Sequence, residues 1–156
     1  MKAIAASAAL LFACTSVSPA GAQQSRLVLE PRTADAIVAR CLAHARDAGQ
    51  SVAVAVFDHS GELVSFSNHG AAPGAAAVAQ WKGRSAAVYR RSTRETGGWN
   101  VPTAPMISTI EGGVPLFAGD VPLGGVGVSG APSAFDAECA TVAAEAAGLA
   151  VEARAR

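Results

Sequence analysis

Lysine and aromatic residues are scarce in this chain, and neither sign of charge is in excess. The 156 residues include 12 basic and 12 acidic residues, and only 5% are aromatic. Proteins that bind nucleic acid usually carry a basic surface, which a near-neutral chain does not supply. We therefore expect no nucleic-acid partner and a core built mainly from aliphatic side chains.

Cysteine is also rare, because the chain contains only Cys14, Cys41 and Cys139. This number is too small for a disulfide scaffold, and the spacing does not match a zinc site. The sequence also lacks the nucleophile elbow, the HExxH motif and the P-loop, so the common hydrolase, zinc protease and NTPase functions lack support. A bridge between Cys41 and Cys139 is permitted in an exported protein, and the sequence leaves their pairing open.

The N-terminal segment has the three parts of a secretory signal peptide. Lys2 supplies the positive start, residues 3–13 form an uncharged and mostly apolar run, and small residues lead to Ala22. This order is typical of a signal peptide that is cleaved on export. We predict a signal peptide over residues 1–22, a mature chain of one domain over residues 23–156, and a periplasmic or secreted location.

Two alternatives to simple cleavage concern the same segment. The apolar run is much shorter than the roughly 20 residues that a membrane-spanning helix needs, so we expect no membrane span. Residues 11–14 loosely resemble a lipoprotein cleavage box, which would place a lipid on Cys14. The bulky Phe12 and the better-formed Ala-x-Ala site favour cleavage after Ala22.

Hydrophobic periodicity and turn residues predict an alternation of helices and hairpins. In chain order we expect a helix over 33–48, strands over 51–57 and 62–67, a helix over 75–90, a long irregular segment over 92–105, a short strand over 106–110, strands over 114–117 and 121–129, and a helix over 134–149. Thr33 and Ser133 are the expected N-caps. Hairpins imply antiparallel pairing. The fold class is therefore α+β, with a single antiparallel sheet of about five strands flanked by helices in a profilin-like or roadblock-like layout.

One segment matches the glycine pattern of dinucleotide-binding proteins. Residues 125–130 read Gly-Val-Gly-Val-Ser-Gly, a literal GxGxxG. The dinucleotide fingerprint requires these glycines at a turn between a strand and a helix, followed by another strand. Here alternating Val and Gly predict the strand itself. We expect its glycines to allow close approach by a packed helix or a neighbouring subunit.

Five motifs in order resemble the GlcG/HbpS family of heme-binding or heme-degrading proteins. They lie at residues 54–64, 79–86, 111–116, 124–131 and 136–140, and the likeness runs from about Arg32 to Ala150. The resemblance implies a small antiparallel-sheet domain that forms a homo-oligomer. It also implies heme or a related tetrapyrrole as a possible cofactor.

Heme binding would require an axial ligand, an apolar slot and a base near the propionates. Three histidines are available. His69 opens the loop after the first hairpin, and His44 lies at the rim of the first helix, so both are candidate axial ligands. His59 is interpreted as a solvated turn residue. Met106 is expected to lie in the core.

Charged residues near these motifs suggest a site for a small anionic ligand. Lys82, Arg84, Glu111, His69 and His44 are the candidate ligand-binding residues. Guanidinium groups suit carboxylates, whether these belong to heme propionates or to a small organic acid. The alternative to heme binding is a cofactor-free lyase or isomerase that acts on a small carboxylate. In either case we expect the pocket near His69, Lys82 and Glu111, with Arg84 from the same helix region.

Overall fold

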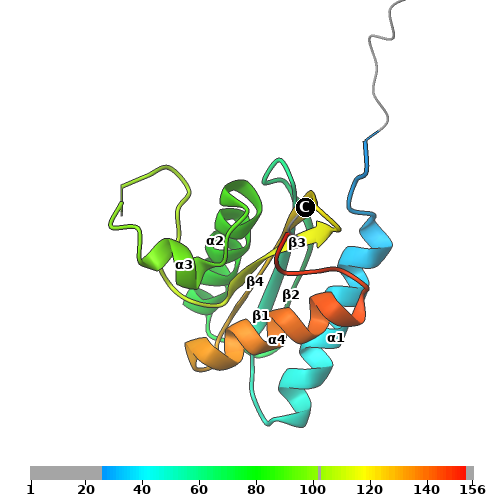
Figure 1. The fold of residues 1–156 in the computed structure, drawn as a ribbon. Coiled ribbons are helices and arrows are strands. Elements are labelled where there is room, and N and C mark those ends of the chain that lie inside the picture. The colour runs from blue at the N-terminus through cyan, green and yellow to red at the C-terminus, as the bar shows by residue number, and fades with distance from the viewer. Residues whose placement is uncertain (1–25, 102, 154–156) are drawn as a thin grey trace, which may run out of the picture.

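The computed structural model describes residues 26–101 and 103–153 as an antiparallel sheet with helices on both faces (Figure 1). The predicted signal peptide over residues 1–22, with Cys14, lies outside the described residues. The elements in chain order are α1 (Pro31–Asp47), β1 (Ala53–Asp58), β2 (Leu63–Asn68), α2 (Pro73–Tyr89), α3 (Thr93–Gly97), β3 (Gly113–Ala118), β4 (Val121–Ser129) and α4 (Ser133–Ala146). No helix within these described ranges is long and apolar enough to cross a membrane.

The sheet has four strands in the order β2-β1-β4-β3, and every neighbouring pair is antiparallel. Both predicted hairpins and the α+β class are confirmed. The short strand expected over 106–110 is absent from the described sheet. Its backbone is bonded to side chains instead, since the Ser108 amide donates to Ser85 Oγ at 2.8 Å and Thr96 Oγ1 donates to the Ser108 carbonyl oxygen at 2.6 Å. These bonds replace a strand ladder.

The helix ends differ from the expected capping residues. The first helix begins at Pro31, two residues before Thr33, and Ser133 is the first residue of α4 rather than its cap. Proline is favoured at the first position of a helix because its missing N–H would be unpaired there in any case. The segment expected to be irregular also contains α3, whose N-cap Ser92 accepts a hydrogen bond from the Glu95 amide at 3.2 Å.

The face of the sheet that packs against α1 and α4 carries the aliphatic core. Its buried side chains include Val54, Val56, Leu116, Val126 and Val128 from the strands. A disulfide joins Cys41 of α1 to Cys139 of α4, with the two Cα atoms 5.2 Å apart. This bridge ties together the two helices that cover one face.

The opposite face packs against α2 through close backbone contacts and through a small buried cluster of alanines around Phe57. A Cβ atom on Gly127 of β4 would overlap the Ala79 carbonyl oxygen and the Gly83 nitrogen of α2. A Cβ on Gly83 would in turn lie 2.8 Å from the Gly127 nitrogen. Glycine is therefore required on both sides of this contact. The GxGxxG segment is thus the predicted strand, with a helix packed closely on its glycines.

The two edges of the sheet are finished differently. At the β3 edge, Phe117 exchanges two backbone hydrogen bonds with Ala150, at 2.8 and 3.0 Å, and the Gly113 amide donates to Thr93 Oγ1 at 2.9 Å. Pro115, between them, has no N–H to offer. Within the described chain no strand lies beyond β2, where Leu63 and Phe66 are exposed. The β3 edge is closed to further pairing, and the β2 edge is open.

Candidate functional site

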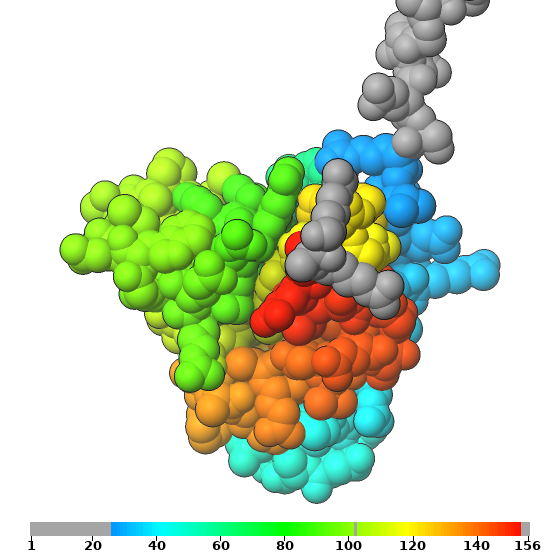
Figure 2. All heavy atoms as spheres, viewed as in Figure 1, coloured from blue at the N-terminus to red at the C-terminus, as the bar shows by residue number. Residues whose placement is uncertain are grey.

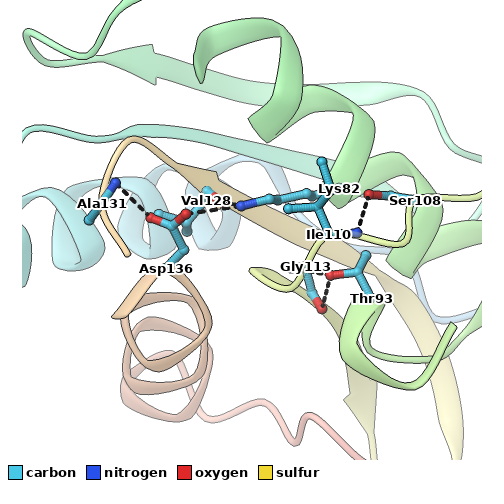
Figure 3. A network of polar contacts seen from close by, with 8 residues as sticks. All are labelled: Lys82, Thr93, Ser108, Ile110, Gly113, Val128, Ala131 and Asp136. Carbon is cyan, nitrogen blue, oxygen red and sulfur yellow. Dashed lines mark hydrogen bonds and ion pairs between the residues drawn. The ribbon is translucent and has the colours of Figure 1, made fainter. Parts of the chain in front are cut away.

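Lys82 is buried in an internal ion pair. Its side chain extends from α2 past the start of β3, and Nζ donates to Asp136 Oδ2 and to the Val128 carbonyl oxygen, both at 2.9 Å (Figure 3). Only 1% of the lysine side chain is exposed. Breaking such a pair leaves a charge buried without a partner, which strongly destabilises a fold. In this arrangement the ammonium group holds α2 to α4 across the sheet and does not face solvent.

Asp136 lies in the first turn of α4 and was not among the predicted site residues. Its Oδ1 accepts a hydrogen bond from the Ala131 amide at 3.2 Å, while Oδ2 faces Lys82. Burial raises the pKa of Asp136 above its ordinary value of 3.8, and the hydrogen bond and charge of Lys82 oppose this rise. The ion pair is thus shielded from water, and its charged state depends on both Lys82 and Asp136.

A cavity of about 450 Å³ lies along the closed edge of the sheet, and we call it the edge cavity. Figure 2 shows this face, with the green α2–α3 region and the orange-to-red α4 and C-terminal region on either side of yellow β3. Its charged lining residues are Arg90, Arg91, Arg94, Glu95, Glu111 and Glu152. Glycines 112 and 113 form part of its wall.

Glu111 is the predicted site residue that lines the edge cavity. Its carboxylate is 3.7 Å from Arg94 Nη1 and 28% exposed. Lys82 lies just behind the wall, because a Cβ on Gly112 would be 2.6 Å from Lys82 Nζ. The structure therefore brings Lys82 and Glu111 into one region, with the Gly112 backbone between the ammonium group and the cavity.

Arg84 belongs to a different cavity, of about 370 Å³, which we call the apolar cavity. Its lining residues are Phe57, Leu63, Gln80, Trp81, Arg84 and Met106. Arg84 Nε donates to the Gly61 carbonyl oxygen at 2.9 Å, and the guanidinium carbon lies 5.4 Å from the centre of the Phe57 ring. These two contacts fix the guanidinium group at the wall of an otherwise mostly apolar hollow.

Met106 does not lie in the core, contrary to the expectation from the sequence. Its side chain is 47% exposed, and its φ of 61° places a non-glycine residue in the left-handed region. Such a backbone costs of order 1–3 kcal/mol and persists only where surrounding contacts impose it. The loop that leads to β3 therefore presents the thioether at the apolar cavity.

The histidines lie apart from both cavities. His69 is exposed, and its amide donates to the Val52 carbonyl oxygen at 3.1 Å. His44 Nε2 is 3.0 Å from Glu138 Oε1, and its ring stacks on Phe135 with the centroids 5.4 Å apart. The lining of neither cavity includes His69 or His44.

The expected convergence of all these residues on one pocket is not found. Lys82 and Arg84 are two positions apart on α2, a spacing that turns their side chains toward different sides of a helix. Glu111 lines the edge cavity, whereas Arg84 lines the apolar cavity. Trp81 and Met106 were missed as site residues. The three-residue spacing of Trp81 and Arg84 could have indicated a shared helix face, but no local signal placed Met106 beside them.

Comparison with known proteins identifies relatives over most of the chain. Residues 29–145 match the family model described as haem degrading protein HbpS-like. Protein GlcG of Escherichia coli is 37% identical over 113 residues, which cover 68% of this chain and 84% of GlcG.

Solved structures show the same fold. The crystal structure of a double mutant of Streptomyces reticuli HbpS has a TM-score of 0.76 and 26% identity, and the alignment covers 86% of this chain and 97% of that one. A PduOC:heme complex aligns with a TM-score of 0.74 over 81% of this chain and 99% of that one. Its sequence identity is 19%, so this second likeness concerns the fold alone.

Proposed function

Because this chain belongs to the HbpS-like family, we propose that it binds heme or a related tetrapyrrole in the apolar cavity. The observation that carries this proposal is that Met106, Arg84 and Trp81 line the same cavity. The family description, haem degrading protein, supports the same class of ligand. The proposal concerns binding, and heme turnover would be a further property of the bound group.

The residues of the apolar cavity offer a candidate for each part of a heme site. Leu63 and Trp81 give it apolar surface, Met106 offers a thioether sulfur as an axial ligand, and Arg84 offers a cation for a propionate. When bound, the heme iron would supply ligand exchange and one-electron chemistry. The chain's own part is to hold the ring against Trp81 and to neutralise a propionate with Arg84. His44 and His69 remain predictions as axial ligands.

The cofactor-free enzyme considered as the alternative receives less support from this arrangement. The pocket expected for it included Lys82, whose ammonium group is buried and bonded to Asp136. A substrate would have to displace that ion pair before it could contact Nζ. The apolar cavity needs no such rearrangement to accept a ligand.

Export and oligomerisation complete the proposal. The signal-like segment predicts a periplasmic or secreted protein, and the Cys41–Cys139 disulfide supports an oxidising compartment. We also propose a homo-oligomer, since the open β2 edge with exposed Leu63 and Phe66 is a surface that a second subunit would cover. Light scattering that gives a monomeric mass at micromolar concentration would exclude this assembly.

A heme titration tests the binding proposal. We expect wild-type protein to give a saturable Soret band, and Arg84→Ala to weaken binding about tenfold, or roughly 1.4 kcal/mol. The matched control is Arg40→Ala, which removes the same charge from an exposed position on α1. Equal affinities for wild type and both variants would place the ligand away from the apolar cavity, and the lack of any saturable band would reject heme binding.

A further inference from the structure

We propose that the edge cavity is a second, separate binding site, and that its ligand is a small organic monocarboxylate carrying a hydroxyl group. The cavity lies on the β3 side of the sheet and shares no lining residue with the apolar cavity. Its volume of about 450 Å³ falls in the range of small-molecule sites. The proposal does not depend on heme binding.

Arg90 is the cation that would hold the carboxylate. Arg91 Nε is 3.1 Å from Glu95 Oε1, and Arg94 faces Glu111, so both of those arginines have acidic partners. Within the part of the chain that the structure describes, the guanidinium group of Arg90 has no hydrogen bond or ion pair. Arg90 is a lining residue of the cavity, and a guanidinium group without a partner matches a carboxylate in both charge and shape.

The backbone at Arg90 supports a functional role for its side chain. Arg90 ends α2 in the left-handed conformation, with φ of 57° and ψ of 35°. Glycine is the usual residue at such a helix end because it has no Cβ to strain. An arginine here therefore costs stability that a glycine would not. In our proposal, ligand binding by Arg90 is the gain that offsets this cost.

The charge of the lining favours a monoanion. Among the described lining residues, the charges of three arginines are balanced by those of three glutamates, Glu95, Glu111 and Glu152. A phosphate dianion would bring more negative charge than the single unpaired Arg90 can balance. Phosphate sites also rely on free backbone N–H groups, and the Gly113 amide already donates to Thr93 Oγ1.

The other lining residues indicate which chemical groups the ligand carries besides its carboxylate. Val114 and Val151 give apolar surface, and the Gly112 backbone forms part of the wall. Glu111, which is only loosely paired at 3.7 Å, can accept a hydrogen bond from a hydroxyl group. No histidine, cysteine or methionine is among the described lining residues, so the cavity does not offer a soft axial ligand for heme.

The test uses 3-hydroxybutyrate as the probe, followed by calorimetry or by chemical-shift titration of the mature protein. We expect saturable binding, a loss of at least tenfold with the uncharged amide of the same compound, and weaker binding of inorganic phosphate. Adding heme should leave the affinity unchanged. Absence of saturable binding, or phosphate binding more tightly than the carboxylate, would overturn the proposal.

The decisive variant is Arg90→Gly, with Arg46→Ala on exposed α1 as the charge-matched control. Glycine suits the left-handed backbone, so the thermal midpoint should be unchanged or higher while the affinity falls at least tenfold. Arg46→Ala should bind as the wild type does. If Arg90→Gly binds normally, or if both variants lose affinity equally, the site is not built on Arg90.

Discussion

The two faces of the sheet are held to their helices in different ways. Valine and leucine side chains fill the space under α1 and α4, and the Cys41–Cys139 disulfide joins those helices. Under α2 the sheet offers Gly125 and Gly127, and the helix comes close enough to touch the backbone. One face is an aliphatic core, whereas the other combines a close backbone contact with a small buried cluster around Phe57.

The two proposed binding sites can be compared with this difference between the faces. The residues that line the apolar cavity come from α2, the strand surfaces beside it and the loop that carries Met106. The edge cavity begins where α2 ends, at Arg90. The edge cavity also reaches α4 through Ala137 and Thr141. The apolar cavity has no lining residue from α1 or α4.

Removing Lys82 should have the largest effect, because its ion pair joins the two faces. We expect Lys82→Met to cost about 3–5 kcal/mol in the free energy of unfolding, since it leaves the Asp136 carboxylate buried without a cation. The double variant Lys82→Met with Asp136→Leu should recover much of this loss. Denaturant unfolding measures both, and a loss below about 1 kcal/mol in the single variant would show that the pair does not hold the layers together.

The pH dependence of this loss has a defined sign. Burial raises the pKa of Asp136, whereas the neighbouring Lys82 lowers it. In Lys82→Met the pKa of Asp136 in the folded protein should therefore lie even further above 3.8. A group with a raised folded pKa loses its contribution to stability as the pH rises through that pKa. The gap between Lys82→Met and wild type should therefore be smallest near pH 4 and largest at neutral pH. A gap that widens toward acid would contradict this assignment.

Removing the disulfide tests the aliphatic face. Cys41 and Cys139 are 98 residues apart, so their bridge restricts a long loop of the unfolded chain. We expect Cys41→Ser with Cys139→Ser to cost about 2–4 kcal/mol, read as a lower thermal midpoint. Heme affinity at a temperature where the variant remains folded should not change. A large loss of affinity would show that the two faces are not separate in function.

Adding a single methyl group to Gly127 tests the close contact between the sheet and α2. Gly127→Ala places a Cβ against the backbone of Ala79 and Gly83, and we expect a cost of about 1–3 kcal/mol from the forced displacement. The control Gly119→Ala introduces the same group where nothing lies within 4 Å, although its φ of 66° adds some strain. Equal unfolding free energies for Gly127→Ala and wild type would mean that α2 moves freely on the sheet.

Local patterns predicted the architecture well. The helix over α1 and the two hairpins follow from apolar periodicity and turn residues, which act within a few positions of the chain. Gly127 was correctly placed in a strand that a helix approaches. The strand predicted over 106–110 was wrong, because amide groups in this segment donate to Ser85 and other side chains rather than to a neighbouring strand. Such hydrogen bonds join residues that only the folded chain brings together.

The site was harder to predict for the same reason. Lys82 is the sole lysine outside the predicted signal peptide and was interpreted as a ligand-binding residue. Its ion-pair partner, Asp136, lies 54 positions away, and sequence spacing gives no measure of such a contact. For a ligand-binding residue, Lys82→Met would be expected to change binding and to leave stability nearly unaltered. The buried geometry predicts a change in stability first.

The most direct test of the account is a heme titration of Met106→Leu. Leucine keeps the size and apolarity of the side chain but has no sulfur lone pair, so the fold and the cavity wall should persist. We expect a shifted Soret band and an affinity at least tenfold lower, while His44→Ala and His69→Ala retain the wild-type spectrum. A wild-type spectrum and affinity in Met106→Leu, with the band lost in either histidine variant, would contradict a heme site in the apolar cavity.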